Sequence, residues 1–120
     1  MKISHLILTG FLALSLNSFA QEATTVIEKK DNVVNESGSA LSTKINRATE
    51  KDIIKAWKSK MKDFDGDVKT NRSTITATEV KIEAIDPNSI QVFAEVRKAT
   101  DQEFEFLVIF IKNGVPLSSE

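Results

Sequence analysis

The clearest periodic pattern along the chain predicts one amphipathic helix. Thr49 is suited to the N-cap position, and Asp52 follows it at the spacing of a capping box. Apolar residues then recur at helical spacing, while lysines occupy the opposite face. The apolar set is Ile53, Ile54, Trp57, Met61 and Phe64, and the lysine set is Lys51, Lys55, Lys58 and Lys62. Gly66 is expected to end the helix in the left-handed conformation of a C-cap.

Alternation of apolar and polar residues predicts strands on both sides of this helix. One short strand is expected from Ala40 onward, and three more are expected over residues 74–85, 90–97 and 103–112. The apolar phase of the 74–85 run changes near Thr78-Glu79, which predicts a β-bulge. Turn-forming residues follow two of these runs, at Asp86-Pro87-Asn88-Ser89 and at Asn113-Gly114.

The order of these elements predicts an α+β fold. One amphipathic helix should pack on one face of an antiparallel sheet of about four strands, in the order β-α-β-β-β. Residues 39–120 are expected to form a single domain. The polar segment 21–38 is either an N-terminal arm or a strand over residues 25–34 that turns through residues 35–38.

The run from Phe106 to Ile111 is apolar on both of its faces, as in a strand that is buried on both sides. A single helix covers only one face of a sheet. The other face therefore needs a second copy of the chain, a protein partner, the N-terminal arm or a further region. We expect Phe106, Val108 and Phe110, with the outward-facing Phe93, to form this interface. Packing of Phe93 under the N-terminal arm is the alternative.

The first twenty residues have the three parts of a cleavable secretory signal peptide. Lys2 supplies a positive start, residues 3–16 are mostly apolar, and Ser18-Phe19-Ala20 places small residues before the cut. The apolar run is shorter than the roughly 20 residues of a spanning helix. The mature chain is therefore expected to begin at Gln21, to lack a transmembrane segment, and to be periplasmic or secreted.

The composition of residues 21–120 excludes several classes of function. These residues contain 15 Lys and Arg against 17 Asp and Glu, a balance that argues against nucleic-acid binding. They contain no Cys and no His, because His5 lies within the signal. Serine–histidine triads, thiol nucleophiles and ordinary zinc sites are therefore excluded. No metal, cofactor or catalytic residue is predicted.

Three polar groupings have a structural and a functional interpretation. Asp63, Asp65 and Asp67 resemble a calcium loop, but Val68 and Thr74 stand where such a loop needs Gly and Glu. A helix-ending turn is the simpler interpretation. The helix lysines are typical of a solvated helix face, and a polyanion site is the alternative. A further group of acids on the strands is typical of cross-strand ion pairs, with acid–base catalysis as the alternative. Its members are Glu79, Glu83, Glu95, Glu103 and Glu105.

From Ala48 to Ser118 the chain resembles a group of exported proteins of unknown function from flavobacteria and their relatives. The similar stretches are residues 56–64, 86–94 and 114–119, together with the Phe-Ala-Gln junction at residues 19–21. Proteins of this group continue into a helical, often coiled-coil region, so the resemblance implies a short member or a fragment. It implies no functional residue.

These observations favour a non-enzymatic binding or interaction module of the bacterial envelope or extracellular space. The expected partner is a second copy or another protein, bound through the C-terminal strand. A carboxylate-dependent hydrolase, or an inhibitor of one, is the alternative, and a polyanion binder is a third.

Overall fold

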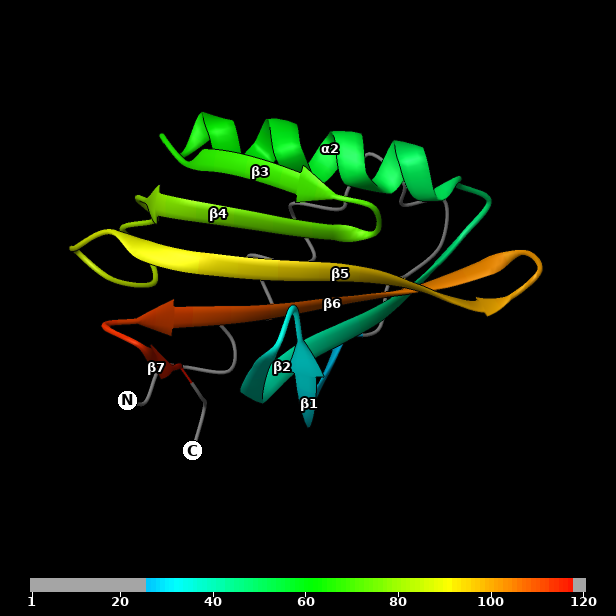
Figure 1. Cartoon of the computed structure of the whole chain (residues 1–120), viewed down its shortest axis with the longest axis horizontal. Helices are drawn as coiled ribbons and strands as arrows, with labels where there is room; N and C mark the ends of the chain where they lie inside the picture. Colours follow the sequence, from blue (N-terminus) through cyan, green and yellow to red (C-terminus); the bar gives the residue numbers. More distant parts are fainter. Residues whose placement is uncertain (1–25, 118–120) are drawn as a thin grey trace.

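A computed structural model of the chain describes residues 26–117, in which an antiparallel sheet of seven strands carries one helix on one face (Figure 1). The elements are β1 (Val26–Val33), β2 (Glu36–Asn46), α2 (Glu50–Asp63), β3 (Asp67–Asn71), β4 (Thr74–Val80), β5 (Ile90–Thr100), β6 (Glu103–Lys112) and β7 (Val115–Pro116). The strand order is β1-β2-β6-β5-β4-β3, and β7 pairs with β6. The predicted α+β class, with one helix on an antiparallel sheet, is therefore confirmed.

The prediction of about four strands is wrong. The structure adds β3 and β7, which were not predicted, and β1, which was predicted only as one of two alternatives. β3 and β1 are the two ends of the strand order, where one side of the ladder is open. Edge strands of this kind are often short and charged, so they lack clean alternation. β3 contains only five residues and four of them are exposed, while β7 has only two residues. In the described part of the N-terminal segment, residues 26–33 form a strand, as in the second of the two predicted forms, but the turn comes earlier than predicted, at Val34-Asn35, and β2 already begins at Glu36.

The bulge predicted near Thr78-Glu79 is confirmed, but the strand that contains it is shorter than expected. The pairing of β4 with β5 shifts between Ala77 and Val80, and Glu79 has a φ of 57°. Beyond Val80 the chain leaves the ladder, because the Lys81 N–H donates to the Phe64 carbonyl at 2.8 Å. Residues 81–89 therefore form a loop in place of the second half of the predicted strand.

The capping box predicted at the start of α2 is confirmed. The Asp52 N–H donates to Thr49 Oγ1 at 3.1 Å, and the Thr49 N–H donates to Asp52 Oδ2 at 3.4 Å. The prediction for the helix end is wrong in one respect. Asp65, with a φ of 62°, takes the left-handed position, and Gly66 does not.

Glycine is required at position 66 because the helix end leaves no room for a side chain there. Its N–H donates to the Met61 carbonyl at 2.9 Å while the Asp65 N–H donates to the Lys62 carbonyl at 3.0 Å, which is the hydrogen-bond pattern of a Schellman motif. A Cβ atom on Gly66 would lie 2.9 Å from the Met61 carbonyl oxygen. A side chain at this position would therefore collide with the helix end that it follows.

The core has two layers, one on each face of the sheet. The larger layer lies between α2 and the sheet and contains Trp57, whose ring meets Phe106 edge-on with centroids 5.0 Å apart. The smaller layer lies on the other face and contains Val33, Ala40, Leu107, Ile109 and Ile111. The expectation that β6 is buried on both faces is thus confirmed, because Phe106 and Leu107 are both fully buried.

The second layer is closed by part of the β1–β2 hairpin, which lies at a steep angle to β6 with its turn reaching that strand (Figure 1). β2 pairs with β6 only from Leu41 onward, and Val33 and Val34 pack with the apolar residues of β6. We call residues 29–40 the strap. Gly38 lets the strap pass β7, because a Cβ atom there would lie 2.7 Å from Pro116 Cβ.

Candidate binding groove

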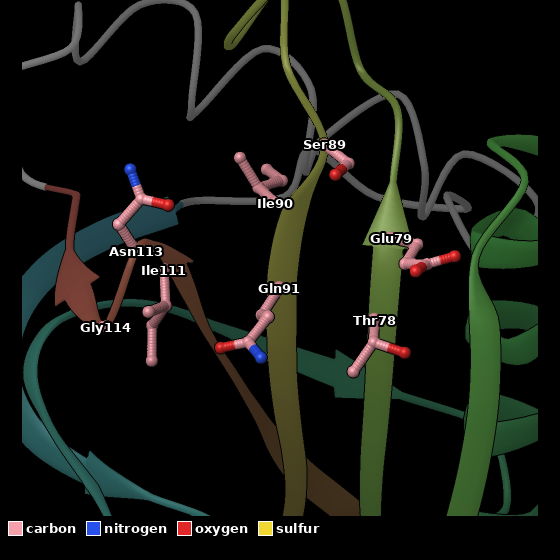
Figure 2. Close-up of a pocket in the computed structure, with 8 residues that line it drawn as sticks. All are labelled: Thr78, Glu79, Ser89, Ile90, Gln91, Ile111, Asn113 and Gly114. Carbon is pink, nitrogen blue, oxygen red and sulfur yellow. The ribbon is translucent and has the colours of Figure 1, made fainter.

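A groove opens at one end of the sheet, where β4 and β6 end and β5 begins (Figure 2). Its volume is about 330 Å³. The lining residues are Thr78, Glu79, Ser89, Ile90, Gln91, Ile111, Asn113 and Gly114. This volume lies at the small end of the range for ligand sites, so the groove suits a small molecule or the end of a chain.

Three local features bring these residues together. The bulge at Glu79 bends the end of β4. Asp86 accepts from the Asn88 N–H at 2.8 Å and from Lys112 Nζ at 2.7 Å, which ties the loop before Ser89 to the end of β6. The salt bridge with Lys112 is the main reason that the pKa of Asp86 is lowered.

The third feature is the turn from β6 to β7. Asn113 and Gly114 are the only two residues between these strands, and their φ angles are 52° and 78°. Positive φ at both central residues is the geometry of a two-residue type I′ hairpin, which Asn-Gly favours. The turn predicted at Asn113-Gly114 is therefore confirmed, and it presents the Asn113 amide at the rim of the groove.

The polar side chains of the groove have no hydrogen-bonding partner in the rest of the described protein. Within residues 26–117, the side chains of Thr78, Glu79, Ser89, Gln91 and Asn113 make no hydrogen bond or ion pair. Ile90 and Ile111 are buried, and Ile111 stands opposite Gln91 in the β5–β6 ladder. Figure 2 shows Gln91 extending from β5 toward Ile111, whereas Thr78 and Glu79 lie on β4 and the Glu79 carboxylate points away from β5.

The charge of the groove restricts its ligands. Glu79 is the one charged side chain among the lining residues, and no Lys or Arg lines the groove. An anionic ligand would therefore meet a like charge with no compensating cation. Hydroxyl and carboxamide groups both donate and accept hydrogen bonds, so the remaining lining suits an uncharged polar ligand.

A second polar cluster joins the strap to the sheet and is satisfied internally. Arg97 binds Asp31 at 3.1 Å and Glu95 at 2.7 Å, and Glu95 also accepts from the Val34 N–H at 3.2 Å. Hydrogen bonding from Arg97 is the main cause of the lowered pKa of Asp31.

Glu105 anchors the other end of the strap. It accepts from Lys29 Nζ at 2.7 Å and from the Ser42 hydroxyl. Burial alone would raise the pKa of Glu105, but these hydrogen bonds outweigh it and lower the pKa. The same contact raises the pKa of Lys29. These ion pairs are therefore structural fastenings of the strap.

The residues predicted as an interface are not on the surface of the single chain. Phe106 and Val108 are 0% exposed and Phe110 is 2% exposed, and all three belong to the core layer under α2. β6 also lies inside the sheet, between β5 on one side and β2 and β7 on the other. Phe93 is half-buried and packs with the second core layer, which includes Val33 and Val34 of the strap.

The other predicted groupings stay apart from the groove, except for Glu79. Glu95 and Glu105 belong to the strap cluster, and Glu103 faces Lys44 at 3.8 Å. Asp63, Asp65 and Asp67 lie at the end of α2, in the turn and at the start of β3. Across residues 26–117, no group of three acidic side chains is arranged to hold a metal ion. Lys60 lies over the Phe64 ring at 5.5 Å.

Comparison with known proteins leaves the family of this chain open. No family model, no curated protein and no solved structure matches the sequence or the fold. Among residues 26–117, no helix has both the length and the apolar character needed to cross a membrane. The signal peptide predicted at residues 1–20 lies outside the described residues.

The groove was not predicted from the sequence, although each of its parts carried a signal. The bulge at Thr78-Glu79, the turn before Ser89 and the turn at Asn113-Gly114 were all predicted. Their meeting depends on the strand order, because β4, β5 and β6 are neighbours only in the folded sheet. The sequence clue to such a groove is that several predicted turns follow strands at the same end of a meander.

Proposed function

We propose that the protein is a non-enzymatic, exported binding module whose ligand site is the groove at the end of β4, β5 and β6. The observation that carries this proposal is the contrast between two polar clusters. The strap cluster is satisfied by its own ion pairs, whereas the five polar side chains of the groove have no partner within residues 26–117. A hollow that gathers unpartnered polar side chains beside buried apolar residues is typical of a ligand site.

The arrangement of carboxylates favours binding over catalysis. Glycoside hydrolysis needs two carboxyl groups, about 5 to 9.5 Å apart, across the scissile bond. The groove contains Glu79 alone, and Glu95, Glu103 and Glu105 are held by Arg97, Lys44 and Lys29. A hydrolase built on these residues would have to break the contacts that fasten the strap and the β2–β6 pair.

The groove chemistry favours a small polar ligand without negative charge. The resemblance to exported flavobacterial proteins and the predicted signal peptide are consistent with a ligand met outside the cytoplasm. Because β6 is enclosed in the sheet, we place the binding site at the groove and no longer at the C-terminal strand.

Nuclear magnetic resonance titration of the protein, purified after export from a bacterial host, tests this proposal. The probes are glucose, N-acetylglucosamine, free lysine, choline and inorganic phosphate. At least one uncharged or cationic probe should shift the backbone amides of Gln91 and Asn113, and Gln91→Ala should weaken that response. Lys55→Ala, on the exposed side of α2, is the matched control and should leave the response unchanged.

Two results would overturn the proposal. The first is a panel in which no probe shifts the groove, or in which phosphate alone acts and its shifts fall on α2. The second is turnover of nitrophenyl glycosides or esters that is lost in Glu79→Gln, which would show an enzyme.

A further inference from the structure

The groove is the end of a larger polar surface on the face of the sheet opposite α2. Residues of β3, β4 and β5 that are paired across the ladders form three rows on this face. The rows are Asp67 and Thr78; Lys69, Thr76 and Phe93; and Asn71, Thr74 and Glu95, and the bulge of β4 ends the first row before it reaches Gln91 of β5. Thr78 and Gln91 also line the groove, so the groove and this polar face are continuous.

We infer that the ligand is a neutral oligosaccharide that enters the groove with one end and extends over Thr76 along β4. This inference rests on the proposed function and names the ligand class of the same site. At the centre of the face, the threonine hydroxyl groups of β4 lie next to the exposed amide of Gln91 and the half-buried ring of Phe93. Sugar hydroxyl groups donate and accept hydrogen bonds, as do Thr, Gln and Asn side chains.

Charge excludes a polyanion on this face. Lys69 is the one cation in the three rows, and Asp67 and Glu95 are the acids. Arg97 already neutralises Glu95 at 2.7 Å, which leaves Asp67 and Lys69 as opposite charges on one strand. The face is therefore close to neutral, and Glu79 makes the adjoining groove slightly negative.

The hydrogen bonding of the sheet argues against a peptide strand. A peptide that extends a sheet binds to the unpaired backbone groups of an edge strand. β4 and β5 are interior strands, each with a ladder on both sides. Recognition on this face must come from side chains, which suits a ligand that carries hydroxyl groups along its whole length.

The threonine hydroxyl groups along β4 also exclude an apolar ligand. Thr76 and Thr78 would lose water without gaining a partner under such a ligand, at a cost for each hydroxyl. The hydroxyl of Thr74 donates to the Asn71 carbonyl at 2.7 Å, so Thr76 and Thr78 are the two free donors. At about 3.3 Å per residue, the row from Thr78 to Thr74 is about 13 Å long, longer than one sugar ring.

Calorimetric titration with cellohexaose, maltohexaose, xylohexaose and chitohexaose tests this inference, with the matching disaccharides, dextran sulfate and trialanine as comparison. At least one hexaose should bind, and more tightly than its disaccharide. Thr76→Val should weaken hexaose binding about three- to tenfold, the effect of losing one hydrogen bond. Valine is a good strand residue, so the sheet should be retained.

Thr70→Val is the matched control, because Thr70 pairs with the buried Ile75 and lies on the α2 side of the sheet. It should leave hexaose binding within twofold of the parent protein. Circular dichroism of both variants shows whether each one is folded.

The outcomes separate this inference from the proposed function. The extended site would be overturned, and the groove site retained, by three results together. The hexaose and its disaccharide would bind with equal affinity, Thr76→Val would leave that affinity unchanged, and Gln91→Ala would weaken it. No binding by any hexaose, while a small probe still shifts Gln91 and Asn113, would overturn the carbohydrate class alone. Binding of dextran sulfate or trialanine in place of the sugars would also overturn it.

Discussion

Asp31 and Arg97 are 66 residues apart in the chain, and their side chains form a two-pronged ion pair that fastens the strap to β5. Arg97 Nη1 donates to Asp31 Oδ2 at 3.1 Å, and Arg97 Nη2 donates to Asp31 Oδ1 at 3.3 Å. The guanidinium also binds Glu95 at 2.7 Å and the Asn32 carbonyl. Four contacts from one planar group give this fastening its geometric specificity.

Replacement of Arg97 by lysine should loosen the strap. Arg97→Lys keeps the charge but loses the fork, and we expect a loss of about 1 kcal/mol in the free energy of unfolding. The value is kept low because Arg97 is 33% exposed and water screens its pairs. Urea unfolding followed by the fluorescence of Trp57, the single tryptophan, measures the change.

Lys98→Ala is the control for this variant, because Lys98 pairs with the fully exposed Asp101 at 3.5 Å. It should change the free energy of unfolding by less than about 0.5 kcal/mol. Equal stability of Arg97→Lys and the parent protein would mean that the second core layer holds the strap without the ion pairs.

The stability of the protein should fall in acid. The pKa values of Asp31 and Glu105 are lowered in the folded state from their ordinary values of 3.8 and 4.5. Their contribution is therefore fully present above about pH 4.5 and is lost as the pH falls through the folded pKa values. Urea midpoints between about pH 7 and about pH 3 should show this decline, and Asp31→Asn should make it shallower. An unchanged slope in Asp31→Asn would contradict the role of this ion pair.

The end of α2 should respond in opposite directions to two glycine changes. Asp65→Gly relieves a positive φ of 62° and should stabilise the protein by about 0.5 to 1 kcal/mol. Gly66→Ala should destabilise it, because the new Cβ atom would lie 2.9 Å from the Met61 carbonyl oxygen. Thermal unfolding measures both. A destabilising Asp65→Gly would show that the Asp65 side chain contributes more than its backbone conformation costs.

Export should remove the first twenty residues. We predict that the protein recovered from the periplasm or medium of a bacterial host begins at Gln21, as measured by the intact mass. Ala20→Arg should block the cut, because the site requires a small residue there. Recovery of the uncut chain from the parent gene would contradict the signal-peptide prediction.

The elements with a strong local pattern could be predicted from the sequence. These features depend on residues that are close together in the sequence. They are the 3.6-residue period and capping box of α2, the bulge at Glu79, and the apolar run of β6 that is buried on both faces. These patterns are strong because each element buries a defined face, and burial selects apolar side chains at the matching period.

Only the tertiary structure decided what covers the second face and where the groove lies. The strap closes over Leu107 because Arg97 and Glu105 meet Asp31 and Lys29 from distant parts of the chain. The groove exists because the strand order places the ends of β4 and β6 beside the start of β5. Local periodicity records which face of a strand is buried, but it does not record its neighbours, since strand order is set by contacts between segments far apart in the chain.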